Sequence, residues 1–188
     1  MGAGDPQMKS GLSISQFAIG GDMTANKVAM YSSDSDMLLV PQEGCLLCTT
    51  EFGKLRVPSK EVLIVPRGCK FSIDIEGKQA RGWIAEVYSG HFAIPDLGPL
   101  GANGLANERD FSAPVAAFED DHGTGAKWTI INRFSGKTFQ YTQDYSPFNV
   151  VAWHGNYYPY KYDLTKFCTI GSISFDHPDP SIFTVLTV

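Results

Sequence analysis

The turn "DHPDP", residues 176–180, contains the histidine whose setting is best suited to chemistry. Pro178 disfavours the α region for His177, and Pro180 does the same for Asp179, so the backbone that carries the imidazole is extended and stiff. An aspartate stands on either side of the histidine–proline pair and could orient the ring. Fixed direction and a pKa near neutrality are what a general base requires. A rigid surface turn is the commoner explanation of such a pattern, and the residue types alone leave both open.

The other three histidines stand in less suggestive surroundings. His91 ends a strand-like run, which is more typical of a hydrogen-bonded structural residue than of a ligand. His122 lies in the polar, glycine-containing stretch "EDDHGTG" and is expected to be a solvated loop residue. His154 lies among aromatic residues that could stack nucleic-acid bases, but a single nearby lysine favours a structural aromatic cluster. No two histidines and a carboxylate form the compact set that a mononuclear iron oxygenase needs.

The overall charge argues against two classes of partner. The chain has 188 residues and a formal net charge of -5, without a cluster of Lys and Arg, so nucleic acid and anionic membranes are not expected partners. No apolar run approaches the roughly 18 residues of a membrane-spanning helix. The first ten residues show no secretory signal, and a cytoplasmic location is therefore expected.

The cysteines do not indicate a metal or redox site. Cys45 and Cys48 form a C-x-x-C within the apolar run "GCLLCTT", with no second pair. Residues three apart on a strand point to opposite faces, which disfavours a zinc or thioredoxin-type site. Together with Cys69 and Cys168 they are expected to be reduced core thiols.

The elements that must position these residues are short β-like runs separated by turn residues. In "KFSIDI", Phe71, Ile73 and Ile75 alternate with polar residues, so one face is expected to be buried and the other wet. Residues 94–120 lack periodicity and predict a long ordered loop, and no helix is expected. The spacing predicts an all-β jelly roll or β-sandwich. The predicted strands are 27–32, 36–41, 44–50, 54–58, 61–66, 70–75, 82–89, 127–134, 137–143, 148–153 and 167–175.

One motif resembles part of the cupin signature. In "VPRGCKF", residues 65–71, the Pro-x-Gly is followed by Phe71 where a metal-binding cupin has a histidine. No histidine occurs before His91, so the earlier His-x-His signature is missing as well. If the chain is cupin-related, this half is a scaffold whose own metal site has been replaced by apolar side chains.

Four long stretches together resemble the homogentisate 1,2-dioxygenase family. They are "LLVPQEGCLLCTTEFGKLRV" (38–57), "PDLGPLGANGLANERDF" (95–111), "SPFNVVAWHGNYYPYKY" (146–162) and "FDHPDPSIFTVLT" (175–187). The resemblance implies a cupin-related fold, a cytosolic location, and homo-oligomers (trimers and hexamers). It implies a non-haem Fe(II) enzyme of tyrosine and phenylalanine breakdown, which opens the ring of homogentisate with O2 to give maleylacetoacetate. In that family the histidine corresponding to His177 is proposed to act on the substrate hydroxyl as an acid/base.

The same resemblance implies that the iron ligands, two histidines and a glutamate, lie beyond Val188. Residues 1–188 are therefore expected to be a single cupin-like β-sandwich scaffold domain, truncated at both ends and ending where the catalytic half begins. On this interpretation the chain alone binds no iron and is inactive. The alternative is a non-catalytic cupin-like β-domain that acts in subunit assembly.

Overall fold

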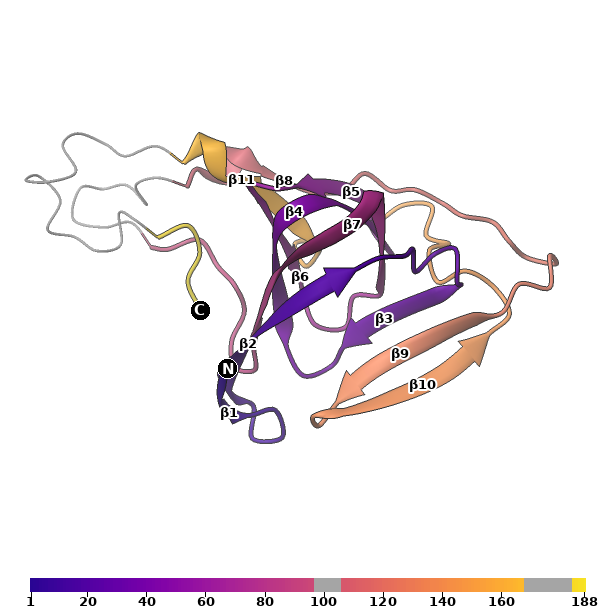
Figure 1. Cartoon of the computed structure of the whole chain (residues 1–188), viewed down its shortest axis with the longest axis horizontal. Coiled ribbons are helices and arrows are strands. Elements are labelled where there is room, and N and C mark those ends of the chain that lie inside the picture. The colour runs from indigo at the N-terminus through magenta and orange to yellow at the C-terminus, as the bar shows by residue number, and fades with distance from the viewer. Residues whose placement is uncertain (97–105, 168–183) are drawn as a thin grey trace, which may run out of the picture.

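The computed structural model describes residues 1–96, 106–167 and 184–188 (Figure 1). Its strands form one hydrogen-bonded sheet in the order β10-β9-β3-β7-β4-β6-β11-β8, with β1, β2 and β5 paired to members of this path. Two short 3-10 turns, η1 (Glu108–Asp110) and η2 (Leu164–Lys166), are the helical elements of the described residues, so the predicted all-β class is confirmed. The strands are β1 (Gly2–Asp5), β2 (Ser10–Ile19), β3 (Val28–Ser32), β4 (Asp36–Thr50), β5 (Gly53–Pro58), β6 (Glu61–Val65), β7 (Phe71–Val87), β8 (Phe111–Ser112), β9 (Trp128–Phe134), β10 (Lys137–Gln143) and β11 (Tyr160–Asp163).

Strands β4 and β7 form the spine of the sheet, with 15 and 17 residues paired antiparallel. Each of them joins two of the predicted strands into one. The pairing shifts register around Glu43, and Gly44 has a φ of 82°. A Cβ at Gly44 would lie 2.6 Å from the carbonyl oxygen of Gln79, so glycine is required at this bulge. The turn-like residues of the sequence therefore mark a bend within a strand, and the strand continues past them.

The main core packs under the curve of β4, β5, β6 and β7. Phe71 and Ile73 are 2% and 3% exposed, as the alternation predicts. The prediction that the opposite face is wet is wrong at Ser72, which is fully buried. Its hydroxyl donates to the carbonyl oxygen of Val28 at 2.6 Å, because the segment that begins β3 covers this face.

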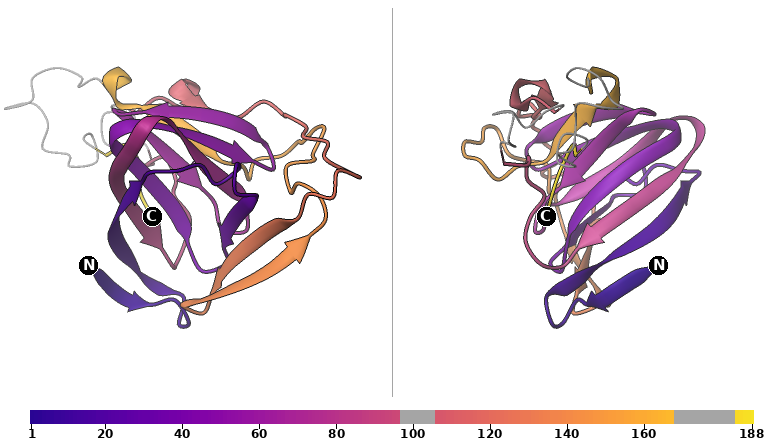
Figure 2. Two further views of the ribbon diagram at one scale, coloured as in Figure 1. Left: turned by 45° about the vertical axis from the view of Figure 1, so that its right-hand side comes forward. Right: turned by 90° about the vertical axis from the view of Figure 1, so that its left-hand side faces the viewer.

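A hairpin of β9 and β10 extends from one corner of the sheet (Figure 2). Strand β9 pairs with β3 in parallel, and a separate small core of Ala29, Trp128, Ile130 and Phe148 supports it. The two-residue turn between β9 and β10 has positive φ at both Ser135 (52°) and Gly136 (70°), which is the geometry that suits a tight hairpin.

The segment that follows β10 departs most from the prediction. The predicted strand 148–153 is wrong, because Phe148 is buried in the small core while Val151 is 75% exposed, and no ladder forms there. Of the predicted strand 167–175 only Phe167 is among the described residues. The described part of the loop 94–120 contains η1 and the short strand β8.

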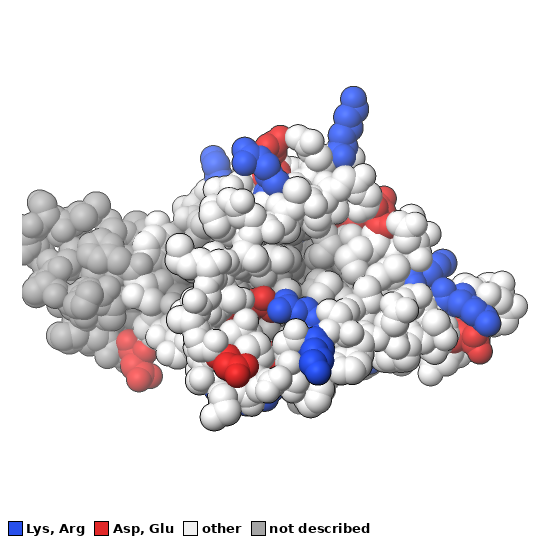
Figure 3. All heavy atoms as spheres, turned by 60° about the horizontal axis from the view of Figure 1, so that its bottom comes forward, with Lys and Arg blue, Asp and Glu red and all other residues white. Residues whose placement is uncertain are grey.

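Charged side chains are scattered over the surface in small groups. Figure 3 turns the underside of Figure 1 forward and shows the described part of that face largely free of acidic or basic side chains. Within the described ranges, no helix is long and apolar enough to cross a membrane.

Candidate functional site

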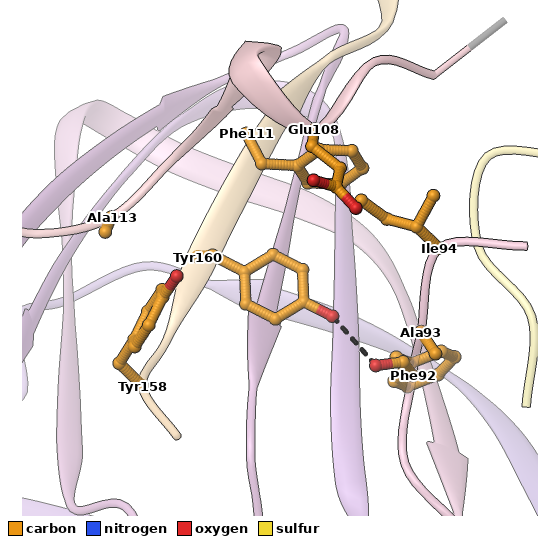
Figure 4. Close-up of a pocket in the computed structure, with 8 residues that line it drawn as sticks. All are labelled: Phe92, Ala93, Ile94, Glu108, Phe111, Ala113, Tyr158 and Tyr160. Atoms are coloured by element: carbon orange, nitrogen blue, oxygen red, sulfur yellow. Dashed lines mark hydrogen bonds between the residues drawn. The ribbon is translucent and has the colours of Figure 1, made fainter. Parts of the chain in front are cut away.

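An aromatic cleft of about 390 Å³ lies where β11, β8 and the segment after β7 meet (Figure 4). Strand β11 contributes Tyr160, and Tyr158 precedes it. One charged group, the carboxylate of Glu108, lines this otherwise mainly apolar cleft. The complete lining is Phe92, Ala93, Ile94, Glu108, Phe111, Ala113, Tyr158 and Tyr160.

Tyr160 is the polar group best fixed within this cleft. Its hydroxyl donates to the carbonyl oxygen of Phe92 at 3.1 Å, and the ring of Phe111 stands edge-on to it at 5.8 Å. Burial raises the pKa of Tyr160 to about 12, and the nearby Asp36 carboxylate acts in the same direction. The phenol therefore stays protonated at neutral pH and acts as a hydrogen-bond donor.

A second cleft of about 250 Å³ shares Phe92, Tyr158 and Tyr160 with the first and contains an Asp–His pair. Oδ2 of Asp36 lies 2.9 Å from Nδ1 of His91. Asp36 is 2% exposed, whereas the side chain of His91 is 57% exposed. A buried carboxylate thus orients an accessible imidazole, an arrangement that can hold or move a proton.

Arg67 completes the network around Asp36. Its backbone N–H and its Nε both donate to Oδ1 of Asp36 at 3.0 Å, while its terminal nitrogens donate to carbonyl groups at the end of β7 and after it. The hydroxyl of Tyr157 donates to the carbonyl oxygen of Arg67 at 2.7 Å, and the Tyr157 ring stands edge-on to His91. His91 is hydrogen-bonded, as the sequence analysis expected.

The segment "SSDSD", residues 32–36, is the polar feature that the sequence did not single out. Four of its five residues are at most 3% exposed. The carboxylate of Asp34 accepts the backbone N–H groups of Ser135 and Gly136 at 2.8 and 2.9 Å, so it holds the β9–β10 turn. The available signal was a run of Ser and Asp between two predicted strands, which are ordinary turn residues and therefore indicate a solvated turn rather than a buried polar cluster.

Glu86 of β7 extends this buried polar cluster. Its carboxylate accepts from the hydroxyl groups of Ser35 at 2.9 Å and Ser13 at 3.1 Å, and from Nη1 of Arg133 at 2.6 Å. Its side chain is 4% exposed. Three strands that are distant in the sequence thus meet at one carboxylate.

His177 and Cys168 lie outside the described residues, so the role predicted for His177 stays a prediction. The chain on both sides of that gap is anchored near the aromatic cleft. Phe167 and Val185 pack against the same buried cluster as Phe92, Phe111 and Tyr160 do, and Ala93 forms a two-bond bridge with Thr187. The buried cluster consists of Val62, Ile64, Ala106 and Tyr162.

The described residues do not fit an iron site. Within the described ranges no group of three or more His, Cys, Asp or Glu is placed to hold a metal ion. His91 is bonded to Asp36, and His122 is exposed and stacks on Tyr145 with 4.8 Å between ring centroids. His154 is also exposed. Facial iron sites need two histidines and a carboxylate around one point, and these three histidines do not supply it.

The other side-chain predictions near these sites are confirmed where they can be compared. Cys45, Cys48 and Cys69 are free and buried. The stretch around His154 forms a structural aromatic cluster, in which Trp153 stands edge-on to Phe52 at 5.4 Å and lies 5.0 Å from Tyr158.

These features define an all-β protein with an aromatic cleft at one end of a curved sheet. The family model "Homogentisate 1,2-dioxygenase N-terminal" matches residues 1–164, and "Homogentisate 1,2-dioxygenase C-terminal" matches residues 165–188. The chain therefore belongs to the homogentisate 1,2-dioxygenase family, as the four sequence stretches predicted.

Individual relatives agree with this assignment. The chain is 56% identical to the homogentisate 1,2-dioxygenase of Caenorhabditis elegans, 54% to that of Homo sapiens and 52% to that of Emericella nidulans. Each match spans 186 residues, which is 99% of this chain and 41% of the relative. The chain thus spans about two-fifths of the length of these curated relatives.

Two solved structures show partial similarity. One is a cupin-2 domain containing protein from Shewanella frigidimarina, at 16% identity and a TM-score of 0.35, covering 40% of this chain and 70% of that one. The other is a putative glyoxylate-induced protein from Pseudomonas aeruginosa, at 14% identity and a TM-score of 0.33, covering 64% of this chain and 42% of that one. Neither overlap carries an argument about fold or function.

Proposed function

We propose that this chain is part of an enzyme that opens the aromatic ring of homogentisate with O2 to give maleylacetoacetate. Family membership is the single observation that carries the proposal, because both family models together account for residues 1–188. On this proposal, residues 1–188 form one cupin-like scaffold domain that adjoins the catalytic half. The enzyme is cytoplasmic and works in tyrosine and phenylalanine breakdown.

Fe(II) is the expected metal of this reaction, and its ligands come from outside the described residues. The Asp36–His91 pair agrees with that proposal, because Asp36 is already shared between His91 and Arg67 and, among the described residues, no second histidine is placed with them to hold a metal ion. The isolated chain is accordingly expected to be inactive.

His177 is the residue of this chain that we assign to the chemistry. Prolines on its C-terminal side restrict its backbone, and a flanking aspartate can fix the ring. The imidazole then takes and returns the proton of a substrate hydroxyl. The anchoring of Phe167 and Val185 next to the aromatic cleft supports a place for substrate at this end of the sheet.

Oxygen consumption with homogentisate and Fe(II) tests the proposal in a version extended through the second family region. His177→Ala is expected to lower kcat roughly 10²–10⁴-fold and to remove one limb of the pH–rate profile. His122→Ala is the matched control, since its exposed ring stacks on Tyr145 away from the cleft. Unchanged turnover in His177→Ala would rule out the acid/base role, and an extended protein without ring cleavage would rule out the activity.

A second function, subunit assembly by a non-catalytic β-domain, is favoured by the exposed strand β10 at one end of the sheet. On this proposal the chain forms homo-oligomers, trimers or hexamers, without contributing metal ligands. Iron binding by the isolated chain at about micromolar affinity or tighter would contradict it.

A further inference from the structure

Strand β10 presents an edge that no described strand covers. It is the terminal strand of the sheet path, and it lies outermost in the hairpin (Figure 1). Six of its seven residues are exposed, and Phe139 and Tyr141 are 51% and 43% exposed. An edge of this length offers a row of unpaired N–H and C=O groups to another strand.

The hydrogen bonds of β9 show which groups of β10 are free. The N–H of Thr129 and the carbonyl of Arg133 bond to the β3 side, each at 2.8 Å, so the odd-numbered residues of β9 face β3. The even-numbered residues of β9 face β10, where their register partners are odd-numbered, such as Phe139 opposite Asn132. The backbone groups of the even-numbered residues Thr138, Gln140 and Thr142 therefore point to the open edge.

This edge lacks the usual protection against pairing. Natural edge strands are guarded by charged residues, proline or bulges. In "KTFQYTQ" the single charge is Lys137, next to the turn, and there is no proline. The edge is also held in place, because Asp34 accepts both backbone N–H groups of the hairpin turn and Glu86 pairs with Arg133 of β9.

The sequence of β10 is nearly symmetric about Gln140. Thr138 and Thr142 are related by this symmetry, and so are the aromatic residues Phe139 and Tyr141. In two antiparallel copies related by a two-fold axis at Gln140, threonine faces threonine and Phe139 faces Tyr141. Lys137 faces the neutral Gln143, so no like charges meet.

The pattern of free backbone groups along β10 agrees with the same axis. An axis at Gln140 makes Gln140–Gln140 and Thr138–Thr142 hydrogen-bonded pairs, which are the residues whose backbone groups point outward. Phe139 and Tyr141 then form the non-hydrogen-bonded pairs, in which side chains approach most closely and aromatic contacts stabilise best. An axis between two neighbouring residues would pair odd-numbered with even-numbered residues and would require backbone groups that are already bonded to β9, and among the axes centred on a residue only the one at Gln140 matches the symmetry of the sequence.

We infer that β10 pairs with β10 of a second copy of this chain, antiparallel and with the two-fold axis at Gln140. The inference rests on the proposed self-association and identifies the strand edge through which two copies associate. It is independent of ring cleavage.

Introducing a charge at Gln140, the residue on the two-fold axis, tests this inference. Gln140→Lys and Gln140→Glu each place two like charges opposite one another in the homodimer, which raises the dissociation constant roughly tenfold or more. An equimolar mixture of the two variants restores association, because Lys then faces Glu. Sedimentation velocity over a concentration series of the 188-residue chain measures both effects, and Gln16→Lys, an exposed glutamine of β2, is the matched control.

The outcomes separate the inference from the assembly proposal. A wild-type chain that stays monomeric at every concentration overturns both. A wild-type chain that associates while both Gln140 variants associate equally well leaves assembly standing and overturns the β10 surface. Weakened variants that the mixture does not restore overturn the two-fold register.

Discussion

Replacing Asp36 by alanine is expected to destabilise the end of the sheet that carries the cleft. Asp36 is 2% exposed and accepts three hydrogen bonds or ion-pair contacts, two from Arg67 at 3.0 Å and one with His91 at 2.9 Å. Alanine removes all three and leaves the Arg67 guanidinium without its carboxylate.

The structure sets the size of the loss. Removing one partner of a buried ion pair costs about 3–5 kcal/mol when the remaining charge has no other acceptor. Arg67 keeps its bonds to the carbonyl oxygens of Val87, Tyr88 and Gly90, and its side chain is 22% exposed, so water reaches it. We therefore expect a loss of about 2–3 kcal/mol in the free energy of unfolding. For a chain of this length that corresponds to a fall in Tm of about 4–12 °C.

Urea-induced unfolding followed by tryptophan fluorescence measures the effect. Asp36→Asn keeps an acceptor for Arg67 and a donor for a neutral His91 ring, so it is expected to lose about half as much as Asp36→Ala. Glu43→Ala is the control, because the Glu43–Arg81 ion pair is exposed on both sides and its removal leaves the midpoint unchanged. If Asp36→Ala unfolded at the wild-type midpoint, the network would contribute nothing to stability and the reasoning would be wrong.

Two further results are expected. Gly53→Ala is expected to lose roughly 1–3 kcal/mol of stability in the same assay, because Gly53 has a φ of 129° and a Cβ there would lie 1.9 Å from the carbonyl oxygen of Val115. Gly123→Ala is the control and must lose less, because a Cβ at Gly123 would have no atom within 4 Å. Burial raises the pKa of Tyr157 and Tyr160 to about 12, so folding favours their protonated forms. That stabilisation is complete below about pH 10 and is lost as the pH rises towards 12, which a tyrosinate absorbance titration and unfolding at each pH measure; ionisation of all tyrosines near pH 10 in the folded chain would contradict it.

The strands were largely predictable because their signals are local. Runs such as 54–58, 61–66 and 137–143 alternate or concentrate apolar residues between turn residues, and they match β5, β6 and β10. Strand β2 was not predicted because it is rich in serine, and six of its ten residues remain exposed where it pairs with β7. The run 148–153 has the composition of a strand, but only Phe148 is used by the core and the rest has no strand to pair with among the described residues.

The polar network around the cleft could not be predicted for a different reason. Asp36 and Arg67 are 31 residues apart, and Glu86 and Arg133 are 47 apart. A charge at the end of an apolar run looks like a solvated end of a strand until its partner is known. Only the sheet order, with β3, β4 and β7 adjacent, brings these groups together.

The five residues 32–36 link the two surfaces to which function is assigned. Asp34 holds the hairpin turn, and through it the position of the β10 edge, whereas Asp36 holds Arg67 and His91 at the cleft. Ser35 lies between them and bonds to Glu86, which holds Arg133 of β9. Replacing both partners of a buried ion pair by apolar residues often changes the net stability little. Each of these buried carboxylates nevertheless accepts from its own set of donors and so holds them in one arrangement. The segment therefore fixes the geometry of both the cleft and the β10 edge, and it would do so whether the chain serves in catalysis or in assembly.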